Sequence, residues 1–463
     1  MDGTRTSQLR DLDVHHLIHP MTNWREHQTL GPVIIAEGRG ATVLDTEGRS
    51  YIDGSACLWN VNVGHGRDEL AEVAAAQMKR LAYSPLFTSM SHEPAIALAA
   101  KLAEIAPGDL SATLFVTGGS EANDTAFKLV RYYWRLKGQP ERVKIISRFG
   151  GYHGLTIAAT AATGIPAYWE RFQPLAPGFL HVSAPNTYAM RVSPAECTRL
   201  CAEELEQLLS REDPDTVAAF IAEPIQGTGG VVVPPQDYLP RMFEICRRHG
   251  VLCIADEVIT GFGRLGSFFG VTQWNVLPDV MTVAKGITSG YAPLAGVVVR
   301  GPLFEELTRL SPDAPFMHGF TYTGHPVGCA VALANIAIIE RERLVENAER
   351  MGRILVEALH ASLDGHPLVG DIRGRGLMAG VELVSDRAAR TKFPVDQSVG
   401  RRVARDAIRR GVLFRPLPGD VIAMSPPLVV TETQIHQMAD ALRGALDATR
   451  DALSREGVLA ARS

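Results

Sequence analysis

Two short apolar runs, each ending in one polar residue, constrain this chain most strongly. Residues 251–255 (VLCIA) stop at Asp256, and residues 280–284 (VMTVA) stop at Lys285. Short, β-rich runs that are apolar throughout are typical of strands in a parallel sheet that is buried on both faces. Ligands in open α/β sheets bind outside the carboxyl ends of the strands. We therefore expect an acid and an amine to point into one crevice at the same edge of a sheet.

This pair has two interpretations. Burial favours the neutral, nucleophilic form of a lysine, and a carboxylate beside it can hold a cationic ring nitrogen. A Schiff-base lysine and a carboxylate partner for the pyridinium are the two groups that an enzyme dependent on pyridoxal 5'-phosphate (PLP) needs. The alternative is a buried salt bridge between Asp256 and Lys285, because structural ion pairs also occur at strand ends.

The composition excludes several classes of protein. Of the 463 residues, 46% are hydrophobic and 21% charged, as in ordinary soluble globular proteins. A net charge of −5 argues against a general nucleic-acid binder. No apolar run approaches the ~18 residues of a membrane span, and the first twenty residues lack the apolar region of a secretory signal. The six cysteines are scattered without a disulfide framework, which indicates reduced thiols in a cytoplasmic protein.

The order of patterns along the chain predicts the domain organisation. Residues 1–58 are expected to form an irregular arm up to about residue 30 and then a short antiparallel meander that joins the small domain. Residues 59–325 alternate helices and strands, which predicts βαβ units and a large domain with a mainly parallel sheet. Residues 326–463 are expected to form a smaller α+β domain. Strands are predicted at 112–117, 143–147, 217–222, 251–255, 280–284, 294–299, 377–384, 412–415 and 421–424. Helices are predicted at 67–81, 93–106, 121–136, 326–360, 396–410 and 431–455.

A glycine-rich turn follows the strand predicted at residues 112–117. It reads GGSE (residues 118–121) and opens a helix. Glycines let backbone N–H groups converge, and a helix N-terminus adds partial positive charge, so Gly119 and Ser120 are candidate phosphate ligands. The alternative is an ordinary strand-to-helix turn with Ser120 as the N-cap.

Three further loops carry polar side chains after predicted strands. The loop FGGYHG places Tyr152 and His153 among three glycines, where the tyrosine ring either stacks on a flat ligand or covers the edge of the core. The segment AEPIQG ends a strand at the carboxylate of Glu223, and the polar turn TYTGHP begins at Thr321, whose hydroxyl can contact a phosphate.

Residues 261–266 (GFGRLG) match the dinucleotide-binding pattern G-x-G-x-x-G. In a true fingerprint the glycines directly follow a strand and open a helix. Here residues 256–260 intervene, and the following SFFG does not resemble a helix. A nicotinamide oxidoreductase built on this motif is therefore kept only as the alternative from another class of enzyme.

Together these segments resemble the class III aminotransferases of PLP fold type I. The resemblance runs from about Trp24 to the last helix, and five motifs occur in the family's order: GSEA, AEPIQG, IADEV, TVAKG and TYTGHP. Five motifs in register are far more specific than any one alone. The resemblance implies an α/β fold with a large domain around a mainly parallel sheet, a smaller α+β domain, and PLP as the cofactor.

The resemblance also implies roles for individual residues. Lys285 holds PLP covalently and moves the proton of the substrate's α-carbon. Asp256 pairs with the pyridine nitrogen and keeps it protonated. Val258 packs on one face of the ring and Tyr152 on the other, and His153 lies beside the cofactor.

The phosphate is expected to bind in this family between two subunits. Gly119 and Ser120 bind it from one subunit, and Thr321 reaches in from the second. Such an arrangement requires a homodimer with shared active sites, with a tetramer as a further possibility.

Within class III, the chain is most similar to ω-transaminases that use amines or ω-amino acids with pyruvate. Trp59 matches an aromatic residue of their substrate pocket, and Arg415 matches a mobile arginine that binds the acceptor's carboxylate. Arginine suits that task because its planar fork meets a carboxylate bidentately; the alternative is a surface arginine. Glu223, at the cofactor, is expected to hold Arg415 when no carboxylate is bound. Leu86 and Phe87 form a pocket wall in which relatives often have two aromatic residues.

We therefore expect a PLP-dependent ω-transaminase that moves an amino group from a terminal amine or ω-amino acid to pyruvate. β-Alanine, taurine, diamines and arylalkylamines are candidate donors. The alternative on the same fold is an aminomutase or decarboxylase. The partners are expected to be small molecules, with neither nucleic acid nor membrane.

Overall fold

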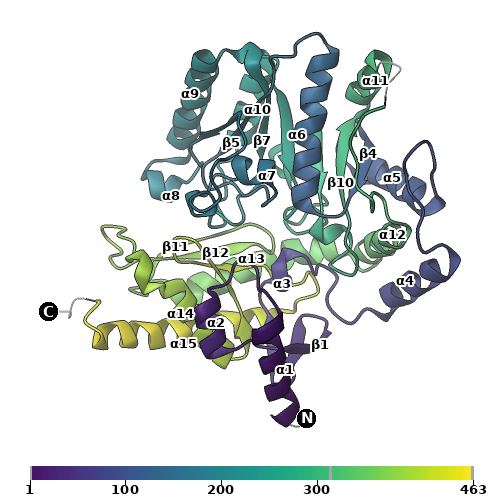
Figure 1. Cartoon of the computed structure of the whole chain (residues 1–463). Coiled ribbons are helices and arrows are strands. Elements are labelled where there is room, and N and C mark those ends of the chain that lie inside the picture. The colour runs from purple at the N-terminus through teal and green to yellow at the C-terminus, as the bar shows by residue number, and fades with distance from the viewer. Residues whose placement is uncertain (1–2, 312–314, 460–463) are drawn as a thin grey trace.

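The computed structural model describes residues 3–311 and 315–459, and it has a large and a small part (Figure 1). The large part surrounds a seven-stranded sheet, and the small part contains two four-stranded sheets. The N-terminal helices lie beside the C-terminal helices in the small part, so the chain leaves it and returns to it.

The seven-stranded sheet has the order β4-β10-β9-β8-β7-β5-β6. Neighbouring strands from β9 to β6 run parallel, whereas β10 is antiparallel to both β4 and β9. The predicted, mainly parallel sheet is therefore confirmed. In sheet order, its strands comprise Leu110–Val116 (β4), Ala295–Arg300 (β10), Val280–Val283 (β9), Leu252–Asp256 (β8), Val217–Ala222 (β7), Lys144–Arg148 (β5) and Phe179–Val182 (β6).

Two apolar cores lie on the two faces of this sheet. Phe220 and Ile221 of β7 pack into different cores, because successive side chains of a strand point to opposite faces. All six residues of β7 are buried, as expected for a central strand covered on both sides. Helices α6 (Gly119–Leu136) and α11 (Gly301–Leu310) contribute to one core, and α5 (Glu93–Ile105), α9 (Pro194–Glu212) and α10 (Tyr238–Arg248) to the other.

The small part joins both ends of the chain. Strands β1 (Ile35–Arg39), β2 (Thr42–Asp45) and β3 (Ser50–Asp53) form the predicted antiparallel meander, and β13 (Val412–Leu413) pairs in parallel with β3. The second sheet has the order β11-β12-β15-β14, with strands Val369–Gly374, Ala379–Leu383, Val421–Met424 and Arg415–Leu417. Helices α13 (Leu344–Leu363), α14 (Val399–Arg409) and α15 (Glu432–Arg455) pack with these sheets and with one another.

The other helices connect or flank these parts. They comprise Gly3–His16 (α1), Trp24–Leu30 (α2), Ala56–Trp59 (α3), Asp68–Arg80 (α4), Ile157–Ala162 (α7), Thr187–Met190 (α8) and Pro326–Arg341 (α12). Single 3-10 turns span Pro166–Tyr168, Pro214–Thr216, Gly270–Trp274, Lys285–Ile287 and Val395–Gln397. Helix α12 packs against α4 and α5 of the large part, although it follows residue 325. The domain limits at residues 58 and 325 stay a prediction.

Several local predictions were wrong. Residues 3–16 and 24–30 form helices instead of an irregular arm. Their sequence shows no apolar periodicity, and α1 is held by polar contacts, including a 3.1 Å hydrogen bond between Thr6 Oγ1 and Thr46 Oγ1. The single helix predicted at 326–360 is broken because Arg343 adopts a left-handed backbone conformation (φ +52°). The prediction also omitted strands β6 and β11, which lie at sheet edges and bury their residues only in part.

Two further features concern the described residues. None of their helices is long and apolar enough to cross a membrane. All six cysteines are free, and only Cys57 is exposed.

Two helical glycines provide a test of how tightly the small part packs. A Cβ at Gly352 in α13 would lie 2.2 Å from the carbonyl oxygen of Gly376, which is backbone and cannot rotate away. We expect Gly352→Ala to lower the free energy of unfolding by about 1 to 3 kcal/mol through overpacking. The measurement is the shift of the denaturant midpoint.

The matched control is Gly444→Ala in α15, whose Cβ would meet only the end of the Arg410 side chain. Because that side chain can move, the control should be neutral or stabilising by up to about 1 kcal/mol, the helix propensity gained. Equal midpoints for the two variants would contradict this account.

Candidate active site

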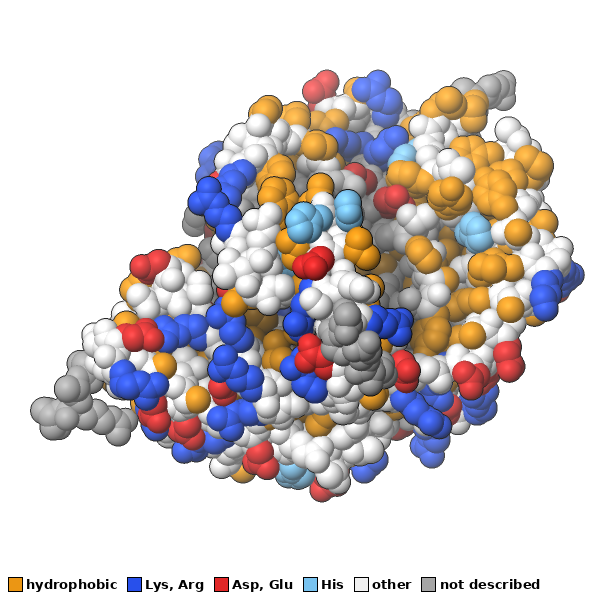
Figure 2. Space-filling model, turned by 60° about the horizontal axis from the view of Figure 1, so that its bottom comes forward, with side chains coloured by type: hydrophobic (Ala, Val, Ile, Leu, Met, Phe, Trp, Pro, Cys, Tyr) orange, Lys and Arg blue, Asp and Glu red, His pale blue; other side chains and the backbone are white. Residues whose placement is uncertain are grey.

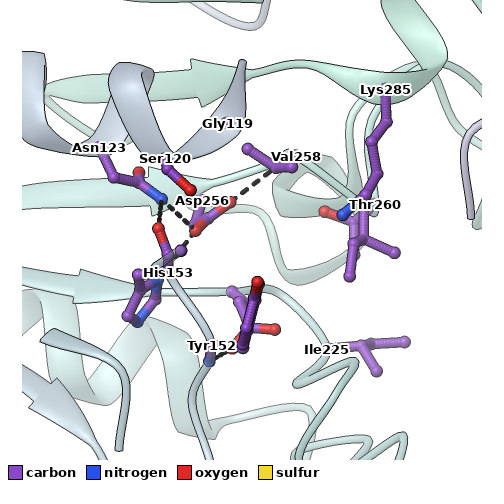
Figure 3. Close-up of a pocket in the computed structure, with 13 residues that line it drawn as sticks. Gly119, Ser120, Asn123, Tyr152, His153, Ile225, Asp256, Val258, Thr260 and Lys285 are labelled. Atoms are coloured by element: carbon purple, nitrogen blue, oxygen red, sulfur yellow. Dashed lines mark hydrogen bonds and ion pairs between the residues drawn. The ribbon is translucent and has the colours of Figure 1, made fainter. Parts of the chain in front are cut away.

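A cavity of about 210 Å³ lies at the carboxyl ends of the parallel strands (Figure 3). Most of the residues predicted for the cofactor meet there: Gly119, Ser120, Tyr152, His153, Glu223, Asp256, Val258 and Lys285. The lining also includes residues that the sequence analysis did not select: Asn123, Gly154, Ile225, Ile259 and Thr260.

Asp256 is the last residue of β8, and only 3% of its surface is exposed. Its Oδ2 accepts a hydrogen bond from Asn123 Nδ2 at 2.8 Å and lies 2.8 Å from His153 Nδ1. Its Oδ1 accepts a hydrogen bond from the backbone N–H of Val258 at 3.1 Å. Figure 3 shows Asp256 between Asn123 and His153 at one side of the cavity. The carboxylate is thus held in one orientation by three donors.

Asn123 is the main residue that sequence reasoning missed. Its Nδ2 also donates to the carbonyl oxygen of His153 at 2.7 Å, and its Oδ1 accepts from Thr282 Oγ1 at 2.8 Å. One buried amide therefore joins α6, the loop of residues 149–154, β8 and β9. The sequence feature that could have identified Asn123 is its position one helical turn after Gly119, on the face of α6 that packs on the sheet.

Lys285 follows β9, the parallel neighbour of β8. Its backbone is left-handed (φ +48°), a conformation that non-glycine residues adopt rarely and mainly at functional sites. Burial lowers the pKa of its ammonium group to about 8, although the charge of Asp256 acts in the opposite direction. A lysine with this pKa has a substantial neutral fraction near neutral pH, which a nucleophile requires.

The N-terminus of α6 faces the same cavity through Gly119 and Ser120. Gly118, not Ser120, is the N-cap, and within the described part of the chain no side chain caps the N–H groups of the first turn. The backbone at Gly119 packs closely against Val258, and the backbone at Gly154 against Ser120. A Cβ at Gly119 would lie 2.9 Å from Val258 Cγ1, and one at Gly154 would lie 2.3 Å from Ser120 Oγ. Uncapped N–H groups and the helix dipole make this end of the cavity suitable for an anion.

Tyr152 and Glu223 form the opposite wall. Glu223 Oε1 accepts a hydrogen bond from the backbone N–H of Tyr152, and Oε2 accepts one from Gly227, both at 2.9 Å. Burial raises the pKa of the Glu223 carboxyl. Burial, with a smaller electrostatic contribution from Tyr168, raises the pKa of Tyr152 to about 12. Tyr152 therefore stays a neutral aromatic surface over the whole working range of pH.

Arg415 lies over the indole ring of Trp59, with its Cζ 5.8 Å from the ring centroid. Burial lowers the pKa of its guanidinium, while the nearby Tyr168 and Tyr152 oppose that change. Among the described residues, no ion pair joins Arg415 to a carboxylate. The predicted contact between Arg415 and Glu223 is therefore absent from this structure, in which the two Glu223 oxygens accept hydrogen bonds from the backbone.

Besides Trp59 and Arg415, three predicted site residues do not line this cavity. Leu86 packs beside Gly324, where an added Cβ would approach its Cδ1 to 2.4 Å, and Phe87 packs against Gly319. Thr321 is exposed, and its carbonyl oxygen accepts a hydrogen bond from Tyr83 at 2.8 Å. The structure thus gathers these residues near one another, away from the cavity of their own chain.

The GFGRLG segment has a structural explanation. Arg264 is completely buried and donates to the carbonyl oxygen of Pro426 and, at 2.8 Å, to Asn62 Oδ1. Glu257 accepts hydrogen bonds from the backbone N–H groups of Gly270 and Val271 at 2.9 and 2.7 Å. The motif forms turns and no α-helix begins directly after it, so it lacks the architecture of a dinucleotide site.

The chain belongs to the class III aminotransferases, because the model of the family "Aminotransferase class-III" matches residues 22–446. It is 41% identical to the putrescine–pyruvate aminotransferase of Pseudomonas aeruginosa over 453 residues, which are 97% of this chain and 98% of that protein. It is 40% identical to the diaminobutyrate–2-oxoglutarate transaminase of Halomonas elongata in an alignment of 467 positions, which covers 99% of this chain and 100% of that protein.

Solved structures agree with these relatives. An (S)-enantioselective ω-transaminase from Thermomicrobium roseum matches with a TM-score of 0.93 and 48% identity, over 96% of this chain and 98% of that one. An ω-transaminase from Pseudomonas jessenii in complex with PMP matches with a TM-score of 0.93 and 42% identity, over 96% and 99% of the two chains. The protein is therefore an aminotransferase with the fold of the PLP-dependent family, as the sequence predicted.

The cavity fits PLP in three respects. It has an anion-binding helix N-terminus, a buried carboxylate, and a lysine whose burial favours its neutral form. The aromatic ring of Tyr152 and the aliphatic side chain of Val258 both line the space between these groups. The alternative of a nicotinamide cofactor does not fit this arrangement.

The pKa of Lys285 leads to a prediction about cofactor binding. After removal of PLP, the rate at which added PLP restores visible absorption should rise with pH around a midpoint of about 8, because the neutral amine is the reacting form. The measurement is the reconstitution rate across a pH series.

An ordinary lysine, with a pKa of 10.5, would give a rate that is still rising well above pH 9. That result would contradict the role of burial. The same shift makes the contribution of Lys285 to folding stability increase between about pH 8 and 10.5, because the unfolded chain holds the additional proton in that window.

Proposed function

We propose that this class III aminotransferase is an ω-transaminase, which moves an amino group from a terminal amine or ω-amino acid to pyruvate. The observation that carries the proposal is the position of Arg415: it is partly buried over Trp59, close enough to Lys285 to affect its pKa, and has no carboxylate partner among the described residues. A buried, unpaired guanidinium favours the binding of a substrate carboxylate.

The residues of this chain would share the reaction as follows. Bound PLP supplies a ring that accepts electrons from the substrate's α-carbon. Lys285 Nζ would take the proton from that carbon in the half-reaction of the donor, and would give a proton to the corresponding carbon of the acceptor in the second half-reaction. Asp256, oriented by Asn123 and His153, holds the ring nitrogen in its protonated form. Tyr152 and Val258 keep the ring between them, which positions the reacting carbon for Lys285.

The charges around the cavity favour an acceptor with one carboxylate. Lys285 is the only Lys or Arg among the described residues that line the cavity, and Arg415 lies nearby. Because Lys285 is needed for the chemistry, only Arg415 is left to bind a carboxylate of the acceptor. This suits an acceptor with one carboxylate, such as pyruvate. One relative is named for pyruvate and another for 2-oxoglutarate, and the second would need a further cation for its distal carboxylate.

The cavity wall favours a donor with an apolar chain. Ile225, Ile259 and Val258 line it, and the indole of Trp59 packs against the backbone at Gly227. Diamines such as putrescine, arylalkylamines, β-alanine and taurine all present a primary amine on such a chain, and the names of the relatives support a diamine first.

We also propose a homodimer with shared active sites, with a tetramer as the alternative. The support is a group of exposed apolar residues near Thr321: Tyr83, Phe87, Met90, Met317 and Tyr322. On the face of the molecule drawn in Figure 2, hydrophobic side chains gather on the right-hand side. A second copy would cover such a surface and bring Leu86, Phe87 and Thr321 to the neighbouring cavity. The free cysteines support a cytoplasmic location.

An aminomutase or a decarboxylase is the second candidate, because both use the same pair of lysine and aspartate. Such enzymes complete their reaction on one substrate and need no keto-acid acceptor. The requirement for pyruvate therefore separates them from a transaminase.

The visible absorption spectrum tests the function directly. The purified protein should be yellow, lose that band when a donor such as putrescine, β-alanine, taurine or an arylalkylamine is added, and regain it with pyruvate. Lys285→Ala is the control and should show no catalytic cycle. If none of these donors bleaches the band, or if a product forms without pyruvate, the aminomutase or decarboxylase would be favoured.

Steady-state kinetics test the role of Arg415. We expect Arg415→Ala to raise the KM for pyruvate about 10- to 100-fold, the value of a lost hydrogen bond to a charged group, while the KM for a carboxylate-free amine changes little. Arg409→Ala, an exposed arginine on α14, is the matched control. Equal changes in both KM values would leave Arg415 as a structural residue only.

A further inference from the structure

A group of three metal-binding side chains lies next to the turn that carries Trp59. Asp53 ends β3, Cys57 is the second residue of α3, and His65 lies in the loop before α4. Their donor atoms Oδ2, Sγ and Nε2 all lie within 4.8 Å of one another. Among the described residues, one other such group exists, formed by Asp13, His19 and His27.

The spacing of the three donor atoms suits a tetrahedral ion. Asp53 Oδ2 lies 2.9 Å from His65 Nε2 and 3.5 Å from Cys57 Sγ, and Sγ lies 3.9 Å from Nε2. Ligand atoms that are each about 2.0 to 2.3 Å from Zn²⁺ at tetrahedral angles lie roughly 3.3 to 3.8 Å from one another. Shifts of a few tenths of an ångström therefore bring all three within bonding distance of one ion.

The contacts around Asp53 are those of an oriented ligand. Only 1% of its surface is exposed, its Oδ1 accepts hydrogen bonds from the backbone N–H groups of Ser55 and Cys57 at 3.3 and 2.9 Å, and its Oδ2 shares the N–H of Cys57 at 2.9 Å. These contacts turn Oδ2 toward Cys57 and His65. Backbone hydrogen bonds of this kind orient carboxylate ligands in known metal centres.

A cavity of about 360 Å³ adjoins the group, and Cys57 and His65 both line it together with Asn60, Ser289 and Tyr291. It provides a path for an ion and space for a fourth ligand, such as water. A thiol, an imidazole and a carboxylate are ligands that zinc accepts in tetrahedral sites.

We propose that Asp53, Cys57 and His65 form a binding site for a zinc ion, with the fourth position open to this cavity. On binding, the Cys57 thiol proton leaves to solvent and a Zn–S bond forms. His65 coordinates through Nε2 and keeps its proton on Nδ1, and Asp53 Oδ2 supplies the third bond. No electron is transferred.

The proposed zinc site is linked to Trp59, because Cys57 and Trp59 belong to the same short helix, α3. Ala56, Cys57 and Trp59 all have left-handed backbones, with φ of +42°, +56° and +63°. Such conformations persist only when their surroundings hold them. An ion that joins Cys57 to Asp53 and His65 would stabilise this turn and with it the position of Trp59.

Metal binding by the holoenzyme tests the proposal. After exhaustive chelation and dialysis, the protein is mixed with Zn²⁺, passed over a desalting column and analysed for metal. We expect one zinc per chain. Co²⁺ in place of zinc should give the red-region absorption of a tetrahedral thiolate site, which is separate from the band of PLP. Absence of both would overturn the proposal.

Variants assign the site to its residues. Cys57→Ser and His65→Asn should each weaken zinc binding at least about 10-fold, as loss of a ligand requires, while His27→Ala in the other group should leave it unchanged. Retained affinity in Cys57→Ser, or its loss in His27→Ala, would overturn the assignment.

A measurement on the unmodified protein avoids any effect of substitution on folding. Cys57 is the one exposed cysteine of the described chain, so zinc should slow its alkylation, followed by mass spectrometry, at least about 10-fold. Alkylation at the same rate with and without bound zinc would show that Cys57 is not a ligand.

Discussion

The buried carboxylate of Asp256 is the group on which the active site depends. A charge so far from water is costly unless donors surround it, and here the donors come from separate elements: the side chain of Asn123, the ring of His153 and the backbone of Val258. The carboxylate thus ties α6 and the loop of residues 149–154 to the end of β8. The contacts that satisfy this buried charge also shape the wall of the cavity.

Lys285 is governed by the same sheet. Because β8 and β9 are parallel neighbours, their carboxyl ends lie at one edge, and the two reactive side chains meet without any long loop to position them. Two opposing effects act on the pKa of Lys285, and burial lowers it more strongly than the charge of Asp256 raises it. The pair is therefore not a simple salt bridge, since Asp256 already has other hydrogen-bond donors and Lys285 remains available for covalent chemistry.

The strands and the reactive pair could be predicted from the sequence because each carries a local signal: an apolar run that stops at one polar residue. Asn123 could not, because its importance comes from three partners that are distant in the chain. The partners of Glu223 could not be predicted either: its oxygens accept hydrogen bonds from the backbone N–H groups of Tyr152 and Gly227, and the contact expected with Arg415 is absent. Helix α1 was missed because polar contacts to the meander hold it, and such contacts leave no periodic pattern.

The parallel pairing of β3 with β13 has a consequence for how the polypeptide acquires its structure during synthesis. Ile52 leaves the ribosome early and its partner Val412 nearly last, so the meander remains an unpaired edge while most of the chain is made. The seven-stranded sheet, whose strands all precede residue 301, is complete long before that. Closure of the small part is thus a late, long-range step, and a nascent chain interrupted before β13 would expose a strand edge to neighbouring chains and to chaperones.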